Sequence, residues 1–321
     1  MPEGQVITVT GPRPASTLGV VDAHDHLLMD SPGMPGQGFS DVERSTEEAR
    51  DGVASGIATL VEMTPIGLGR DPAGLRAISE RSGLAVIAAS GFHRDAHYPA
   101  GSWVYDASVE VLRDRIVTDL TVGMHPADWH DPSLPLDPAR AGAIKGGASY
   151  HHISHAERRR LEAIGAASAA TGAAILVHTE IGTAAHEIVD LLESAGATTD
   201  RIALAHLDRN PDWELHAEVA ARGVTLEYDT VGRTKYHPDS VVLDLLERVA
   251  AAGHLDRLVL GLDLGAASYL RAYDGGPGMR YLMTTFVPRL RRRLGDDAVA
   301  RILVANPARL YALPAGAGAA A

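Results

Sequence analysis

The stretch GVVDAHDH, residues 19–26, is an apolar, β-branched run that ends in two histidines two positions apart. On a strand, that spacing turns both imidazoles, His24 and His26, to the same face. Further apolar runs also end at a side chain able to bind a metal ion. These are Lys145 in AGAIKGG, His178 in AAILVHTE, His206 in RIALAHLD and Asp263 in LVLGLDLG.

The intervals between these positions are regular. Lys145 and His178 are 33 residues apart, His178 and His206 are 28 apart, and His206 and Asp263 are 57 apart, about two such steps. A strand–helix–strand unit needs roughly 30 residues. Eight apolar runs follow this rhythm, at 19–26, 57–64, 84–91, 142–147, 173–180, 201–208, 224–231 and 258–265.

Strands that alternate with helices indicate a parallel sheet, and eight of them predict an α/β fold of the (β/α)8 TIM barrel type. A doubly wound open sheet also alternates, but its ligand lies at one crevice. Only a barrel gathers the ends of the first, fourth, fifth, sixth and eighth strands around one mouth.

The chain of 321 residues fits one barrel with insertions. We expect one domain over residues 1–314 and a low-complexity tail over 315–321. Helices are predicted from Thr46, over 154–170 with Ser154 and Glu157 in a capping pattern, and over 183–195, 211–222, 240–252 and 278–294. The long connection 90–141 is expected to supply a loop over the mouth.

Composition excludes several classes of function. A formal charge of -12, without a basic stripe, argues against a nucleic-acid partner. The absence of cysteine excludes disulfides and thiolate ligands. The N-terminal residues lack the apolar core of a signal peptide, and no run is long enough to span a membrane. We therefore expect a cytoplasmic protein that acts on a small molecule.

Imidazoles and a carboxylate suit divalent metal ions, zinc first, with manganese, cobalt or iron also suitable. Lys145 is unusual because an ammonium repels metal cations. It is either neutral or has reacted with CO2 to form an anionic carbamate. Six other histidines fall in loops or helices and are expected to have surface or capping roles: His151, His152, His155, His186, His216 and His254.

The motifs H-x-H, I-K, H-T-E, H-L-D-R-N-P-D and a final G-x-D resemble the phosphotriesterase-like branch of the amidohydrolase superfamily. The resemblance covers residues 9–313. It extends to TPIGLGRDP at 64–72, KGGASYHHIS at 145–154, YDTVGRTKYHPDS at 228–240 and SYLRAYDGGPG at 268–278.

This resemblance implies a binuclear hydrolase. His24, His26 and Asp263 would hold the more buried metal, and His178 and His206 the more exposed one. Carboxylated Lys145 and a hydroxide would bridge the pair. Two such cations lower the pKa of a shared water and polarise the electrophile. Asp263 would accept the hydroxide proton and pass it to the leaving oxygen.

Substrate contacts are expected from residues around the mouth. His93 stands where relatives often carry an aromatic residue over the metals. The other expected contacts match a sub-branch similar to lactonases of phosphorylated sugars: Lys235, Tyr236, Tyr269 and Arg271. Glu62 is expected to be structural, and Asp208 and Arg209 to orient His206. The family's barrels are commonly dimers, so a homodimer is left open.

Those lactonases typically carry two arginines where this chain has Ala266 and Ala267. Arginine grips phosphate bidentately and alanine does not. The sequence therefore predicts a lactonase acting on a small, polar, unphosphorylated lactone. The alternative is an amide, carbamate or cyclic amide hydrolase with the same metal centre. Phosphotriester hydrolysis and a catalytically silent metal-binding scaffold are the minor alternatives.

Overall fold

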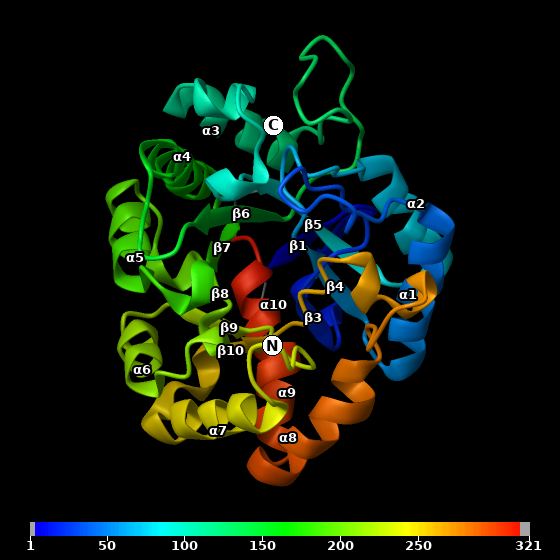
Figure 1. Cartoon of the computed structure of the whole chain (residues 1–321), viewed down its shortest axis with the longest axis vertical. Helices are drawn as coiled ribbons and strands as arrows, with labels where there is room; N and C mark the ends of the chain where they lie inside the picture. Colours follow the sequence, from blue (N-terminus) through cyan, green and yellow to red (C-terminus); the bar gives the residue numbers. More distant parts are fainter. Residues whose placement is uncertain (1–3, 315–321) are drawn as a thin grey trace.

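The computed structural model describes residues 4–314, so the expected tail at 315–321 lies outside the described residues. All eight predicted strands are present, and parallel neighbours pair in chain order from first to last. Helices surround this sheet on all sides (Figure 1). The strands are β3 (Val21–Asp25), β4 (Thr59–Glu62), β5 (Ala85–Gly91), β6 (Ala143–Ala148), β7 (Ala174–Thr179), β8 (Ile202–Ala205), β9 (Thr225–Tyr228) and β10 (Leu258–Leu260).

The barrel closes between the end of β10 and β3. The backbone N–H groups of Leu262 and Asp263 both donate to the carbonyl of His24, at 3.1 and 2.9 Å. A Cβ at Gly261 would lie 2.8 Å from the Cβ of His24, so only glycine permits this approach. The predicted TIM barrel is confirmed, and its closure places Asp263 beside His24.

The outer ring is formed by the helices that connect successive strands. They are α1 (Val42–Ser55), α2 (Pro72–Ser82), α3 (Val109–Thr121), α4 (His155–Thr171), α5 (Ala185–Ser194), α6 (Trp213–Ala221), α7 (Asp239–Val249), α8 (Val287–Leu294), α9 (Asp296–Ala300) and α10 (Asn306–Tyr311). Three π-helical turns extend this set, at Ala250–His254, Leu282–Phe286 and Arg301–Ala305. Single 3-10 turns include Asp95–His97, Glu180–Gly182, Leu207–Arg209 and Ala267–Tyr269.

Helix caps explain where the predicted bounds hold and where they are wrong. Ser154 and Glu157 form the expected capping box at the start of α4. The first helix was expected from Thr46 but begins at Val42, because the Asp41 side chain accepts from two N–H groups of the first turn. The segment predicted as one helix over 278–294 is a π turn followed by α8.

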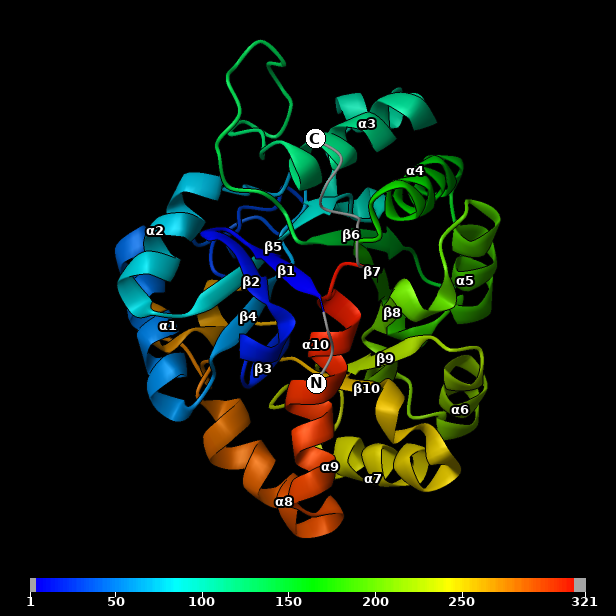
Figure 2. The same cartoon turned by 180° about the vertical axis from the view of Figure 1, so that it is seen from behind.

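The bottom of the barrel is closed by both ends of the described chain. A hairpin of β1 (Gln5–Thr8) and β2 (Gly11–Pro14) crosses it, and Val9 N–H donates to the Val86 carbonyl. The hydroxyl of Tyr311 in α10 donates to the Ala23 carbonyl. Figure 2 shows the hairpin and α10 in front of the barrel. None of the described helices is long and apolar enough to cross a membrane.

The long connection 90–141 only partly lies at the mouth. Its first residues, His93, Arg94 and His97, line the pocket described below. Most of the remainder forms α3 and a loop that projects outward at the rim (Figure 1). The expected cover over the mouth is therefore limited to the residues directly after β5.

Candidate metal centre

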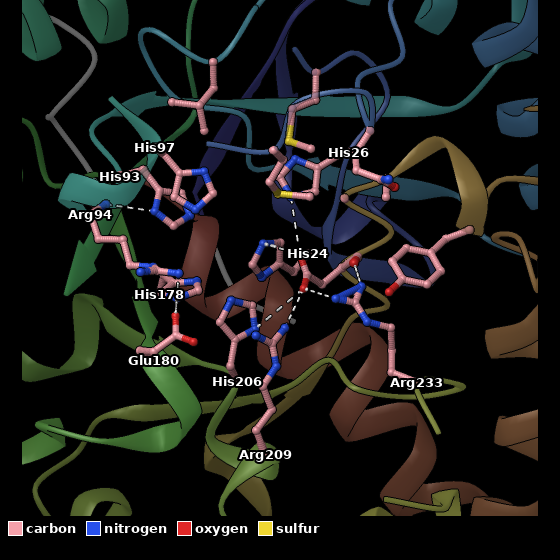
Figure 3. A pocket seen from close by; sticks show the side chains of 18 of the residues that line it. His24, His26, His93, Arg94, His97, His178, Glu180, His206, Arg209 and Arg233 are labelled. Carbon is pink, nitrogen blue, oxygen red and sulfur yellow. Dashed lines mark hydrogen bonds and ion pairs between the residues drawn. The ribbon is translucent and has the colours of Figure 1, made fainter. Parts of the chain in front are cut away.

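The predicted ligands converge at the carboxyl ends of the strands. Lys145 Nζ lies 3.1 Å from His24 Nε2. Asp263 Oδ1 lies 3.6 Å from His24 Nε2 and 3.4 Å from His26 Nε2. The ring of His206 stands between those of His24 and His178, with centroid separations of 5.2 and 4.5 Å. Five separate stretches of the barrel thus supply one cluster (Figure 3).

Each of the four histidines has one ring nitrogen held by a polar neighbour, so the other is the one that can bind a metal; in His24 this second nitrogen lies 3.1 Å from the Lys145 amine. Such second partners fix the tautomer and orientation of metal-binding imidazoles. The held atoms are His24 Nδ1 by Glu227 at 3.2 Å, His26 Nδ1 by Thr64 at 2.8 Å, His178 Nε2 by Glu180 at 2.8 Å and His206 Nδ1 by Asp229 at 2.7 Å.

Glu62 extends this arrangement. The Thr64 hydroxyl donates to Glu62 Oε1 at 2.5 Å, so the His26 Nδ1–H must be the donor to Thr64. Glu62 is completely buried and acts on His26 through Thr64. This agrees with the expected structural role of Glu62.

Two of the predicted ligands have a backbone conformation that side chains rarely adopt. His206 has φ 64° and Asp263 has φ 49°, both in the left-handed region. Each follows the end of its strand, where the chain turns sharply. Strain of this kind concentrates at functional sites, where the surrounding structure holds it.

The side chains of this cluster suit divalent cations, except that Lys145 would have to be modified to take part. Lys145 is 1% exposed, and burial lowers the pKa of its amine below the ordinary value. Burial likewise lowers the pKa of His24 far below the ordinary value and that of His178 to about 4, so both rings are neutral at neutral pH. A neutral amine is the form that reacts with CO2, and the carbamate product would supply the missing anionic oxygens. The residues present therefore fit two metal ions.

Asp263 is held by two arginines on one side. Its Oδ2 accepts from Arg209 at 2.6 Å and from Arg233 at 2.9 Å, whereas Oδ1 faces the imidazoles. Burial alone raises the pKa of Asp263, but the Arg233 guanidinium and the neighbouring imidazoles hold it well below its usual range. Arg209 was expected to orient His206; the structure places its guanidinium on Asp263.

A pocket of about 310 Å³ opens over these ligands. Four of the five predicted substrate contacts line it: His93, Lys235, Tyr236 and Tyr269. The fifth, Arg271, lies elsewhere, with Nε 3.6 Å from Asp51 Oδ2 and its side chain half exposed. Arg271 turns away because the 3-10 turn Arg271–Tyr273 packs against α1 instead of the mouth.

Several pocket residues were not predicted from the sequence. Arg94, His97, Glu180 and Arg233 all line it. Glu180 belongs to the H-T-E motif, and its distance of two residues from His178 is a signal that could have found it. Arg233 carries no such signal, because only the folded loop after β9 brings it to Asp263. His216, expected to have a surface or capping role, is buried, with Nδ1 2.6 Å from the Tyr228 hydroxyl.

A family model describing the Phosphotriesterase family matches residues 4–311. The chain belongs to the phosphotriesterase family. Like other members, it is a metal-dependent hydrolase, as the converging ligands predicted.

Named relatives match most of this chain. A phospho-furanose lactonase from Mycoplasmopsis agalactiae is 33% identical over 96% of this chain and 91% of its own. An N-acetyltaurine hydrolase from Mus musculus is 30% identical over 79% of this chain and 73% of its own. The crystal structure of an amidohydrolase from Mycoplasma synoviae has a TM-score of 0.94 and 32% identity, covering 98% and 94% of the two chains.

Proposed function

We propose that this phosphotriesterase-family member is a lactonase with a binuclear metal centre. His24, His26 and Asp263 would hold one ion, His178 and His206 the other, and carboxylated Lys145 would lie between them. The observation that carries this proposal is the set of four imidazoles whose second nitrogens are already satisfied, gathered around Lys145 and Asp263. Zinc suits these ligands, and manganese, cobalt or iron would also fit.

Two bound divalent ions would supply a hydroxide nucleophile and polarise the substrate carbonyl. Asp263 has the geometry of a proton acceptor, because Oδ1 faces the ligands while Arg209 and Arg233 fix Oδ2. Held ionised, it would take the proton of the attacking group at Oδ1. When the ring C–O bond breaks, it would return that proton to the leaving oxygen.

Charge in the pocket favours a substrate without phosphate. Arg209 and Arg233 are occupied by Asp263, and Arg94 pairs with Glu180 at 3.0 Å. Lys235 lies between tyrosine rings, and no described carboxylate forms an ion pair with it. Ala266, at a position where related lactonases carry arginine, lines the same pocket. One unpaired ammonium suits a neutral or singly charged lactone better than a phosphate dianion.

The test is a pH-indicator assay of the zinc- and manganese-loaded protein with sugar lactones in pairs, with and without a 5-phosphate. We expect the unphosphorylated member of each pair to be opened with the higher kcat/KM. Ala266→Arg should raise kcat/KM for the phosphorylated member about tenfold or more, the effect of ~1.4 kcal/mol. Ala266→Met, of similar bulk without charge, is the control.

A wild-type preference for the 5-phosphates would overturn this substrate assignment, because Lys235 would then suffice for the dianion. In every case Asp263→Asn should abolish turnover. If the chain were a silent scaffold, this variant would change nothing, since the wild type would also be inactive.

An amide substrate is the second candidate, and the relative named N-acetyltaurine hydrolase favours it. The same carboxylate would then protonate a leaving nitrogen instead of an oxygen. Small N-acyl amides therefore belong in the same assay. Turnover of an amide without turnover of any lactone would replace the lactonase proposal with this one.

A further inference from the structure

The backbone of His93 is held in one position by its neighbours. Its N–H donates to the Tyr98 hydroxyl at 2.9 Å, and that hydroxyl donates to the Ile66 carbonyl at 2.8 Å. The preceding Gly91 has φ 105°, and a Cβ there would lie 2.2 Å from the Lys145 carbonyl oxygen. Only glycine allows β5 to end this close to β6, so the strand end fixes where the loop delivers His93.

One hydrogen bond determines which nitrogen of His93 carries the proton. The backbone N–H of Arg94 donates to His93 Nδ1 at 2.8 Å. A backbone N–H can only donate, so Nδ1 accepts and has no proton. A cationic imidazole carries a proton on both nitrogens, so a ring with a bare Nδ1 is neutral and carries its proton on Nε2.

The Nε2–H group of His93, which lines the pocket, is free to bind a ligand there. Among residues 4–314, no side chain or carbonyl accepts a hydrogen bond from it. The His93 ring lines the pocket, with its centroid 4.6 Å from that of His178 and 3.8 Å from that of His97 (Figure 3). The His93 ring is therefore a neighbour of one of the predicted metal ligands, His178.

We propose that His93 is a catalytic hydrogen-bond donor, and that its Nε2–H binds the substrate oxygen on which negative charge develops during carbonyl attack. This role rests on the proposed hydrolase function and deepens it. No proton leaves the ring; the N–H dipole, fixed before the substrate arrives, stabilises the developing charge. The neighbouring His97 cannot be assigned in this way, because its Nδ1 meets the Ser31 hydroxyl, which either donates or accepts.

The first experiment measures the tautomer without any substrate. Two-bond ¹H–¹⁵N correlation spectra of the uniformly ¹⁵N-labelled full chain distinguish protonated from bare ring nitrogens. The His93 signals are identified by their loss in His93→Gln, and the exposed His152 provides a reference ring. We expect a proton on Nε2 and none on Nδ1, with and without zinc. A proton on Nδ1 would overturn the proposal.

The second experiment separates donation from packing. Phenylalanine keeps the ring and loses the donor, whereas the glutamine side-chain amide places an N–H near the position of Nε2. With γ-butyrolactone and phenyl acetate as probes, His93→Phe should lower kcat about 10²-fold with little change in KM. His93→Gln should recover most of that loss.

A purely packing role predicts the opposite order, with phenylalanine close to wild type and glutamine worse, and that result would overturn the donor role. Wild-type inactivity on both probes and on the lactone and amide panel would count against the proposed function. The tautomer experiment would still decide whether His93 presents the donor, so the two failures are distinguishable.

Discussion

At the scale of single residues, the partners of the predicted ligands differ in exposure. Asp229 and Glu227 are completely buried behind their histidines, but Glu180 is partly exposed at the mouth. Glu180 accepts a hydrogen bond from His178 at 2.8 Å and forms an ion pair with Arg94 at 3.0 Å. The hydrogen bond to His178 lowers the pKa of Glu180 to about 2, so it is ionised at any working pH. Glu180 therefore links a predicted metal ligand, His178, to Arg94 in the pocket wall.

Glu180→Ala should lower the affinity of the second metal ion about 10- to 100-fold, because His178 loses the partner that orients it. Chelator competition followed by metal analysis measures this directly. The amide oxygen of Glu180→Gln still accepts the hydrogen bond, so the metal affinity of this variant should lie between those of Glu180→Ala and the wild type. Arg94→Met removes the ion pair but leaves His178 oriented, so its metal affinity should match that of the wild type. Equal metal affinity in Glu180→Ala and wild type would show that His178 needs no such partner.

The difference between the predicted and unpredicted site residues has a physical cause. His24, Lys145 and Asp263 follow apolar runs, and the carboxyl ends of parallel strands must meet, so their convergence follows from the pattern alone. Arg233 and Arg94 lie in loops whose path depends on tertiary contacts, such as the guanidinium–Asp263 bonds that exist only after folding. Sequence spacing contains no information on such contacts. Arg271 shows the converse, since matching the family motif did not bring it into the pocket.

At the scale of elements, the start of α4 organises two of the mouth loops. Glu157 is completely buried, and its carboxylate accepts from the backbone of Ser154, at 3.1 Å, and of Asp95, at 3.0 Å. It also accepts from the hydroxyl of Ser149 at 2.6 Å. One capping residue thus ties the loop after β5 and the loop after β6 to the same helix. The loop after β5 is the one that carries His93 and Arg94.

Glu157→Ala should reduce the free energy of unfolding by about 3 kcal/mol, because several buried donors lose their acceptor at once. Urea denaturation of the full chain measures this. Glu187→Ala is the matched control: it is also a first-turn glutamate, in α5, but it is exposed, and its loss should cost under ~0.5 kcal/mol. A similar small change in both variants would mean that the buried network does not contribute.

The strands were easier to predict than the helices for a related reason. Each barrel strand is buried and therefore a short, continuous apolar run between turn residues. Helices α2 and α3 were not identified, because charged and small residues interrupt their apolar faces. The start of α1 was misplaced because Asp41 is followed by a polar first turn, so the apolar pattern begins later than the helix does.

At the scale of the whole molecule, the barrel buries more carboxyl groups than the nearby cationic side chains can neutralise. Asp22, Asp25, Glu227 and Asp229 are all completely buried beneath the metal centre. Burial raises the pKa of Asp22 to about 7 and raises that of Glu227 well above its usual range. Metal cations held above them would offset this charge. Removing the metals should therefore make the stability of the barrel depend on pH through these carboxyls.

For Asp22 the sign follows from linkage. Its folded pKa, about 7, lies above the ordinary value of 3.8, so folding takes up a proton between those limits. Its contribution to stability is therefore fully present at low pH and is lost as pH rises through about 7. The buried histidines act in the opposite direction, because burial lowers the pKa of His24 and His206 below the ordinary value. Only a comparison with a variant isolates the Asp22 contribution.

We expect Asp22→Asn in the chelator-treated protein to remove this contribution. The free energy of unfolding of wild type, minus that of the variant, should fall by about 2 kcal/mol between pH 5.5 and pH 8, since one pKa unit corresponds to ~1.4 kcal/mol. Denaturant titrations at several pH values measure the difference. Asp274→Asn, at an exposed carboxylate, should leave the pH dependence unchanged. If the difference in the free energy of unfolding between wild type and Asp22→Asn stays constant with pH, the prediction is wrong. Asp22 would then be ionised in the folded barrel, with another cation neutralising it there.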